Sequence, residues 1–205
     1  MMKGITTALI CLAVAGFTAT GSAAAPSEIA GFMLGANINQ YENQLNPQAA
    51  FPLNEMRYLS EIETSSVKGF RKGEIVYGTC DKPGRIVRIK LKYADPSKDF
   101  YDRLLQGFKK KFGAPDEWRG DAFHQFLAWK WSFKTATGES VSMILQHATA
   151  DDLDHPSGNV VKLTNWTWVD EEKRCYHKKA SEPLTGQSKK TIAEGPIEFN
   201  YYIPN

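Results

Sequence analysis

The sequence lacks the short motifs that mark many catalytic sites. It contains no GxSxG, no HExxH, no CxxC and no glycine-rich loop of the kind that cradles phosphate. It also lacks an excess of one charge, with 25 lysine and arginine residues against 23 aspartate and glutamate residues. Because nucleic-acid binding needs a strongly basic surface, this balance argues against a nucleic-acid partner.

Long apolar runs are absent after the first 25 residues, so we expect no transmembrane segment. The opening stretch has Lys3, an apolar run over residues 5–17 and small residues over 22–25. That run is too short for a bilayer of about 30 Å, which needs about 20 apolar residues. The pattern predicts a signal peptide over residues 1–25 and a periplasmic or secreted protein.

Cysteine is also scarce, with three in the chain. Cys11 is the candidate for lipidation, but Ile10 stands before it where a small residue is expected. Export would place Cys80 and Cys175 in an oxidising compartment, which favours a disulfide between them. Two separate buried thiols are the alternative, because a sequence gives no distances.

The clearest periodic segment is SKDFYDRLLQGFKKKF, residues 97–112. Its apolar residues recur at the spacing of one helical face. Asp95 or Ser97 can cap the first amides, and Gly113 can end the helix. The lysines at 109–111 complement the negative end of the helix dipole, so we do not read them as a nucleic-acid patch.

Alternating apolar residues predict three strands after this helix, followed by a short closing helix. The strands cover residues 126–133, 140–147 and 159–168, and the helix covers 169–179. The first half repeats the order more faintly. A helix is predicted over 37–45, with Asn37 as its cap, and strands over 55–65, 73–80 and 84–93.

Turns such as DKPG and TATGE join neighbouring strands, which makes the expected sheet mostly antiparallel. The predicted fold is α+β, with two tandem helix-plus-three-strand units forming one sheet and the helices on one face. We expect a single domain over residues 26–179. Residues 180–205 read as a linker and a strand-like tail, which docks on its own sheet or adds to the sheet of another chain.

Two short motifs and the order of elements resemble small exported bacterial proteins. Leu34 and Gly35 precede the first predicted helix, and Gly113 and Pro115 follow the second. An LG turn before a short helix and a GxP closure are similar to the β-lactamase inhibitor protein family and to small lipoproteins that assist outer-membrane assembly. Here the two motifs come from different halves, and no lipidation cysteine is in place. The resemblance implies a binding or assembly role, and no functional residue carries over.

The stretch HATADDLDH, residues 147–155, raises the possibility of a metal site. Imidazole and carboxylate groups together suit zinc or a similar ion, with candidate ligands at His147, Asp151, Asp152, Asp154 and His155. The spacing matches no established motif, and turn residues alone account for the stretch. We therefore expect a polar loop and no cofactor. A motif-less periplasmic hydrolase, with or without a metal, is the alternative function, and its site would be His147 to His155.

Aromatic and basic residues supply the candidate binding surface. Trp129 and Trp131 continue an apolar strand face and are expected in the core. Trp166 and Trp168 share a predicted face with polar residues and are candidates for an exposed aromatic platform.

Across from the apolar side of the strand at 84–93 stand Arg88, Lys90 and Lys92, a basic ridge suited to an acidic partner. The plain alternative is the solvated face of a half-buried sheet. The sequence thus predicts a non-catalytic protein that binds a protein or an envelope component through a sheet face, using some of Trp166, Trp168 and this ridge.

Overall fold

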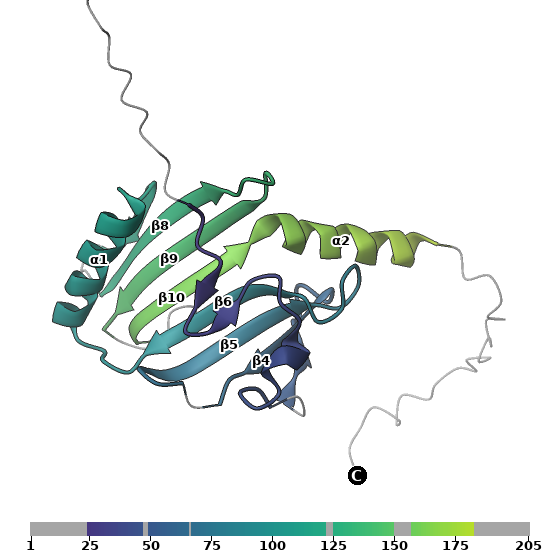
Figure 1. Cartoon of the computed structure of the whole chain (residues 1–205), viewed down its shortest axis with the longest axis horizontal. Helices are drawn as coiled ribbons and strands as arrows, with labels where there is room; N and C mark the ends of the chain where they lie inside the picture. The colour runs from purple at the N-terminus through teal and green to yellow at the C-terminus, as the bar shows by residue number, and fades with distance from the viewer. Residues whose placement is uncertain (1–23, 47–48, 66, 122–124, 150–156, 183–205) are drawn as a thin grey trace, which may run out of the picture.

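Strands with a two-residue period pair into one large antiparallel sheet (Figure 1). The computed structural model of the chain describes residues 24–46, 49–65, 67–121, 125–149 and 157–182. The strand order in the sheet is β3-β4-β5-β6-β10-β9-β8-β7. The bounds are β3 (Phe51–Pro52), β4 (Leu59–Glu63), β5 (Phe70–Gly78), β6 (Ile86–Tyr93), β7 (Glu117–Gly120), β8 (Phe126–Lys134), β9 (Ser140–Ala148) and β10 (Gly158–Asn165).

Each half of the chain supplies four neighbouring strands, and the halves meet where β6 pairs with β10. The antiparallel α+β class is confirmed, but the units of three strands are wrong. The edge strands β3 and β7 are two and four residues long, too short for a period of two to reveal them. A separate hairpin, β1 (Glu28–Ile29) and β2 (Phe32–Met33), was also not predicted.

The predicted first helix, 37–45, is reduced to the single 3-10 turn η1 (Ile38–Tyr41). Its predicted cap is confirmed, because the Asn37 side chain accepts a hydrogen bond from the amide of Asn39 at 3.0 Å.

Helix α1 (Lys98–Phe112) forms as the periodicity predicts. The Ser97 hydroxyl accepts a hydrogen bond from the Phe100 amide at 3.2 Å, and Gly113 ends the helix at a φ of 84°. The apolar face of α1 packs on the side chains of one face of the sheet, among which Trp131 and Leu145 are fully buried. The core position predicted for Trp131 is confirmed, and Trp129 packs half-buried against the same cluster.

Helix α2 (Trp166–Ser181) begins three residues earlier than predicted, so the strand expected through Trp168 is wrong at its end. The Asn165 side chain accepts a hydrogen bond from the Trp168 amide at 3.1 Å and caps the helix. Trp166 and Trp168 therefore lie in the first helical turn and do not alternate along a strand.

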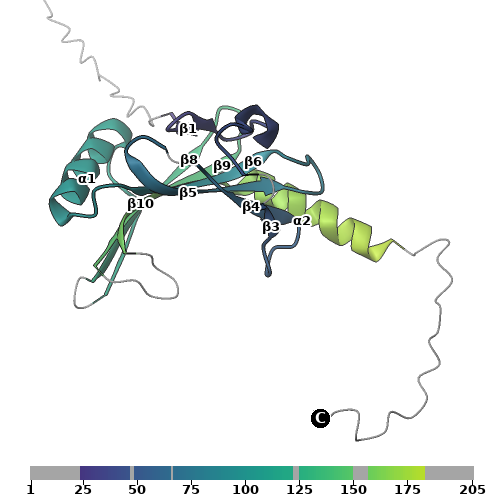
Figure 2. The ribbon, with the colours of Figure 1, turned by 90° about the horizontal axis from the view of Figure 1, so that it is seen from below.

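The two helices pack on opposite faces of the sheet, which corrects the expectation of helices on one face. Val169 of α2 belongs to a cluster with Leu59, Val76 and Val87. Val76 alternates along β5 with Ile75, which belongs to the cluster under α1. Figure 2 shows α1 and α2 at opposite ends of the sheet.

A buried carboxylate joins α2 to the turn between β5 and β6. Glu172 is fully buried, and its two oxygens accept hydrogen bonds from the backbone amides of Cys80, Asp81 and Lys82 at 2.7 to 2.9 Å. The guanidinium of Arg85 lies 3.6 Å from the same carboxylate. One turn of helix further on, Cys175 forms the predicted disulfide with Cys80, closing a separation of 95 residues.

Three expectations fall wholly or largely outside the described residues. These are the signal peptide over 1–25, the strand-like tail beyond 182 and most of the HATADDLDH stretch. Among the helices that the structure describes, none has the length and apolarity needed to span a bilayer.

Replacing Glu172 with glutamine is expected to lower the free energy of unfolding by about 3 kcal/mol, because the buried charge that satisfies three amides and faces Arg85 is lost. The matched control is Glu171→Gln. Glu171 pairs with the same arginine at 2.9 Å from a more exposed position, and its loss is expected to cost less than about 1 kcal/mol. Urea unfolding of the oxidised proteins measures both. Equal losses would contradict the role given to Glu172.

Candidate functional site: the open face of the sheet

The face of the sheet that points away from α1 is here called the open face, although α2 packs on one end of it. It carries a cluster of cations where β6 meets β10. Directly opposite residues of an antiparallel pair point to the same side. Lys90 faces Lys162, Arg88 faces Thr164, and Lys92 faces Val160. The predicted ridge of Arg88, Lys90 and Lys92 therefore lies on one face, and β10 adds a fourth cation to it.

Lys162 is the cation of this cluster with the least compensation. Its side chain is largely buried, and it forms no ion pair with any carboxylate of the described residues. Burial, together with the positive charges of Arg88 and Lys90, lowers the pKa of Lys162 to about 8. By contrast, the Lys90 amine donates to Glu74 at 2.8 Å. Two lysines that face each other across a strand pair destabilise a sheet, so this arrangement costs stability.

Several hydrogen-bonding groups beside Lys162 find no partner in the described part of the chain. They are the side-chain amide nitrogen of Gln146, the hydroxyl of Thr164 and the Nε of Arg88. Gln146 is 9% exposed and Thr164 is 1% exposed. A buried donor without an acceptor costs about 1–3 kcal/mol, and such groups are rare in folded proteins. The donors lie on the same face as the uncompensated amine, so together they suit a ligand rich in acceptor atoms.

Of these groups, Lys162 and Gln146 line a hollow of about 330 Å³ over β7 to β10. Its lining comprises Glu117, Arg119, Phe126, Ala128, Lys130, Ser142, Ile144, Gln146, Lys162 and Trp166. Three cations and one carboxylate are among them. Glu117 accepts from Arg119 at 2.6 Å and from Lys130 at 3.1 Å, and these hydrogen bonds lower its pKa. Because this carboxylate is already shared by two partners, the hollow keeps a net positive charge.

Trp166 forms one wall of the hollow, and its position follows from the cap at Asn165. Its indole nitrogen donates to the Ser142 hydroxyl at 2.8 Å, and the Arg88 guanidinium lies 5.9 Å from its ring centre. The side chain remains 42% exposed. Trp166 thus combines a fixed orientation with an accessible aromatic surface beside the cations.

Trp168 does not share this site. Its ring lies under Arg85 at 5.2 Å and so close to Gly35 that a Cβ there would approach the ring within 2.7 Å. The expected platform of two tryptophans does not form, because residues two positions apart in a helix point in different directions. Of the five predicted binding residues, the structure brings Arg88, Lys90, Lys92 and Trp166 onto one face and places Trp168 elsewhere.

The structure describes only one of the five candidate metal ligands, His147. His147 is 4% exposed, and its Nδ1 lies 2.8 Å from the side-chain oxygen of Asn159. The Asn159 amide nitrogen in turn donates to the carbonyls of Asp95 and Ser97 at the start of α1. His147 is therefore part of the junction between β9, β10 and α1. The other four candidates, Asp151, Asp152, Asp154 and His155, lie outside the described residues. Among the residues that the structure describes, no group of three or more potential metal ligands occurs.

Replacing Lys162 with methionine is expected to raise the free energy of unfolding at pH 7 by about 2 kcal/mol, because the wild-type protein buries an uncompensated cation. The pKa of Lys162 is lowered from 10.5 to about 8, so between these pH values the unfolded chain holds the proton and the folded chain does not. Wild-type stability therefore rises through this window, and the advantage of the variant shrinks by pH 10.

Denaturant unfolding at pH 7 and pH 10 measures this difference. Lys110→Met is the matched control, because it removes the same charge from an exposed position on α1. A variant at 162 that is less stable than the wild type at both pH values would mean that the amine supports the fold.

Comparisons of the chain with protein-family models, with curated proteins and with solved structures find no significant match. The similarity to β-lactamase inhibitor protein and to outer-membrane-assembly lipoproteins therefore stays a prediction from the sequence.

Proposed function

We propose that the protein is an exported, non-catalytic binding protein that recognises an acidic segment of a partner protein through the open face. The observation that carries the proposal is the hollow lined by Lys162, a cation that pairs with no carboxylate of the described residues, and by the unpartnered side-chain amide of Gln146. A carboxylate from a partner would supply both the missing charge and the missing acceptor atoms. Its interaction with Lys162 would be strengthened because the amine is withdrawn from water.

The surroundings of the hollow suit a protein partner. Tryptophan and arginine are enriched among the residues that contribute most to protein interfaces. Trp166 lines the hollow, and Arg88 lies against the ring of Trp166. The other cations of the open face would steer an acidic partner toward the site at low ionic strength.

Lysines with a lowered pKa also occur in enzymes as bases or nucleophiles. Here the neighbours of Lys162 are Arg88, Lys90 and the unpartnered donors of Gln146 and Thr164. Cations and donors around an amine favour the holding of an anion over the removal of a proton from a substrate. Binding is therefore the function that these groups support best.

The Cys80–Cys175 disulfide is consistent with an oxidising compartment, where such bonds persist. Together with the predicted signal peptide it supports a periplasmic or secreted protein, and the acidic partner is then sought among envelope or secreted proteins.

Photo-crosslinking in the cell that makes the protein tests this function. A benzophenone amino acid replaces Phe126, an aromatic residue at the hollow, and adducts are identified by mass spectrometry after irradiation. We expect a discrete protein adduct through an acidic segment, and at least a tenfold loss of it when Lys162→Met is added. Lys110→Met is expected to leave the adduct unchanged.

The same amino acid at Phe51, an exposed residue of the far edge strand β3, is expected not to give this adduct. An adduct that is sensitive to glycan digestion, or one indifferent to Lys162→Met, would argue against an acidic protein partner at the hollow.

A further inference from the structure

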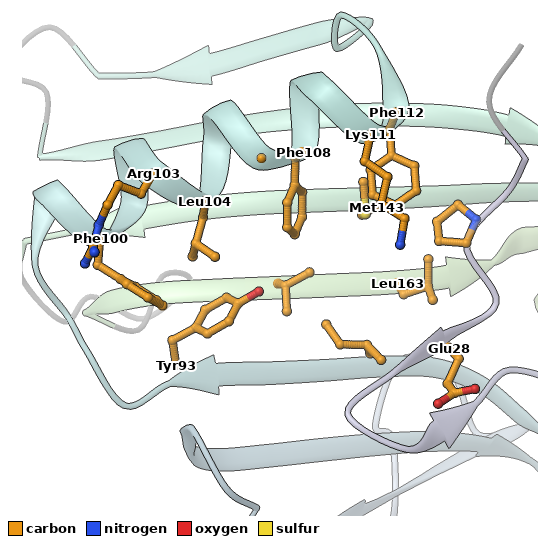
Figure 3. Close-up of a pocket in the computed structure, with 14 residues that line it drawn as sticks. Glu28, Tyr93, Phe100, Arg103, Leu104, Phe108, Lys111, Phe112, Met143 and Leu163 are labelled. Atoms are coloured by element: carbon orange, nitrogen blue, oxygen red, sulfur yellow. The ribbon is translucent and has the colours of Figure 1, made fainter.

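A second concave surface lies on the other side of the sheet, between α1 and the hairpin of β1 and β2 (Figure 3). It is an apolar groove of about 490 Å³, within the range of about 300–1,000 Å³ that is typical of small-molecule sites. Phe100, Leu104 and Phe108 of α1 form one wall, and Ile29 and Pro26 form the other. The floor consists of buried side chains from the central strands, namely Tyr93, Met143, Val161 and Leu163.

Polar groups occur at defined points of this groove. Arg103 lies at one end, with its guanidinium 5.5 Å from the ring centre of Phe100, and Lys111 lies at the other end (Figure 3). Within the described residues, neither cation forms an ion pair with a carboxylate. They lie eight positions apart on α1, which is about 12 Å along the helix axis. The Tyr93 hydroxyl points toward the middle of the groove in Figure 3.

The two ends differ in charge. Glu28 lies at the same end of the groove as Lys111, on the opposite wall (Figure 3). The Arg103 end has no carboxylate in the lining. Asp95, whose pKa Arg103 helps to lower, is held mainly by hydrogen bonds with Ser97. An anionic head group therefore meets less repulsion at Arg103 than at Lys111.

We propose that this groove binds a single-chain amphiphile with a carboxylate head, such as a fatty acid, with the head at Arg103 and the hydrocarbon chain along Leu104 and Phe108 toward Met143. An arginine presents two parallel N–H groups to a carboxylate, which fixes the orientation of the head. The hydrocarbon chain would lie along Leu104 and Phe108, whose side chains carry no polar atoms. This site is separate from the open face and does not depend on its function.

Gly107 provides a variant that fills the groove without harming the fold. It lines the groove from α1, and a Cβ at this position would meet no atom within 4 Å. Glycine also weakens a helix interior, so any other helix-compatible residue is expected to raise the melting temperature. Gly107→Phe places a ring in the groove, and Gly107→Ala is the matched control that adds only a methyl group.

The probe is cis-parinaric acid, a fatty acid whose fluorescence rises in apolar surroundings, titrated into the full purified protein. We expect saturable binding that falls at least tenfold in Gly107→Phe and is kept in Gly107→Ala, with neither variant melting below the wild type. Absence of saturable binding, or binding unaffected by Gly107→Phe, would overturn the site. Lys162→Met leaves the groove intact and is expected to bind the probe normally.

Competition tests the head group. Dodecanoic acid is expected to displace the probe at least tenfold more effectively than 1-dodecanol, and Arg103→Gln is expected to remove this preference. Lys111→Gln removes an equal charge at the other end and is expected to keep it. Equal displacement by acid and alcohol would overturn the carboxylate head, and loss of the preference in Lys111→Gln alone would overturn its place at Arg103.

The chain's own apolar tail is the competing occupant. Phe199→Asp combined with Ile203→Asp is expected to leave the affinity for the probe unchanged. An affinity that rises at least tenfold in this variant would assign the groove to the tail and overturn the amphiphile.

Discussion

The pairing of β6 with β10 decides what each face of the protein presents. Leu91 faces Val161 on the side covered by α1, while Lys90 faces Lys162 on the open side. Side chains of a strand alternate with a period of two, so a shift of this pair by one residue would bring lysines under α1 and leucines into water. The register is therefore held by the apolar face. The same register places Lys90 opposite Lys162 on the open face. One strand pairing therefore fixes both the apolar face under α1 and the cations on the other face.

Local patterns in the sequence were enough for α1, β8, β9 and the central part of the antiparallel sheet, because each of these carries its own period and end signals. They failed where structure depends on distant partners or on a few residues. Strands β3 and β7 form by pairing with the edges of β4 and β8. They are two and four residues long, which is too short for a sequence pattern to predict them. The switch from β10 to α2 did have a local signal, since asparagine is among the best helix caps, but the alternation of Trp166 and Trp168 obscured it.

The candidate site was predictable to the same extent. Alternation along β6 identified Arg88, Lys90 and Lys92 as one ridge, and the structure keeps them on one face. Lys162 could not be added to that ridge from the sequence, because it lies about 70 residues further along the chain and joins the ridge only through strand pairing. The unpartnered amide of Gln146 could not be found either. A polar residue in a buried strand position is visible in the sequence, but whether it has a partner is a property of three-dimensional packing.

The buried carboxylate of Glu172 and the disulfide fasten α2 to the same turn. Cys80 emerges from the ribosome and from any export channel long before Cys175, since 95 residues separate them. The carboxylate that binds the turn at residues 80–82 sits on α2, the last described element, one helical turn before Cys175. In the folded protein the two sulfurs meet because α2 is docked against the turn between β5 and β6. Folding of the last described helix therefore favours this pairing of cysteines, and the disulfide then holds that helix to a turn that lies 95 residues earlier in the chain.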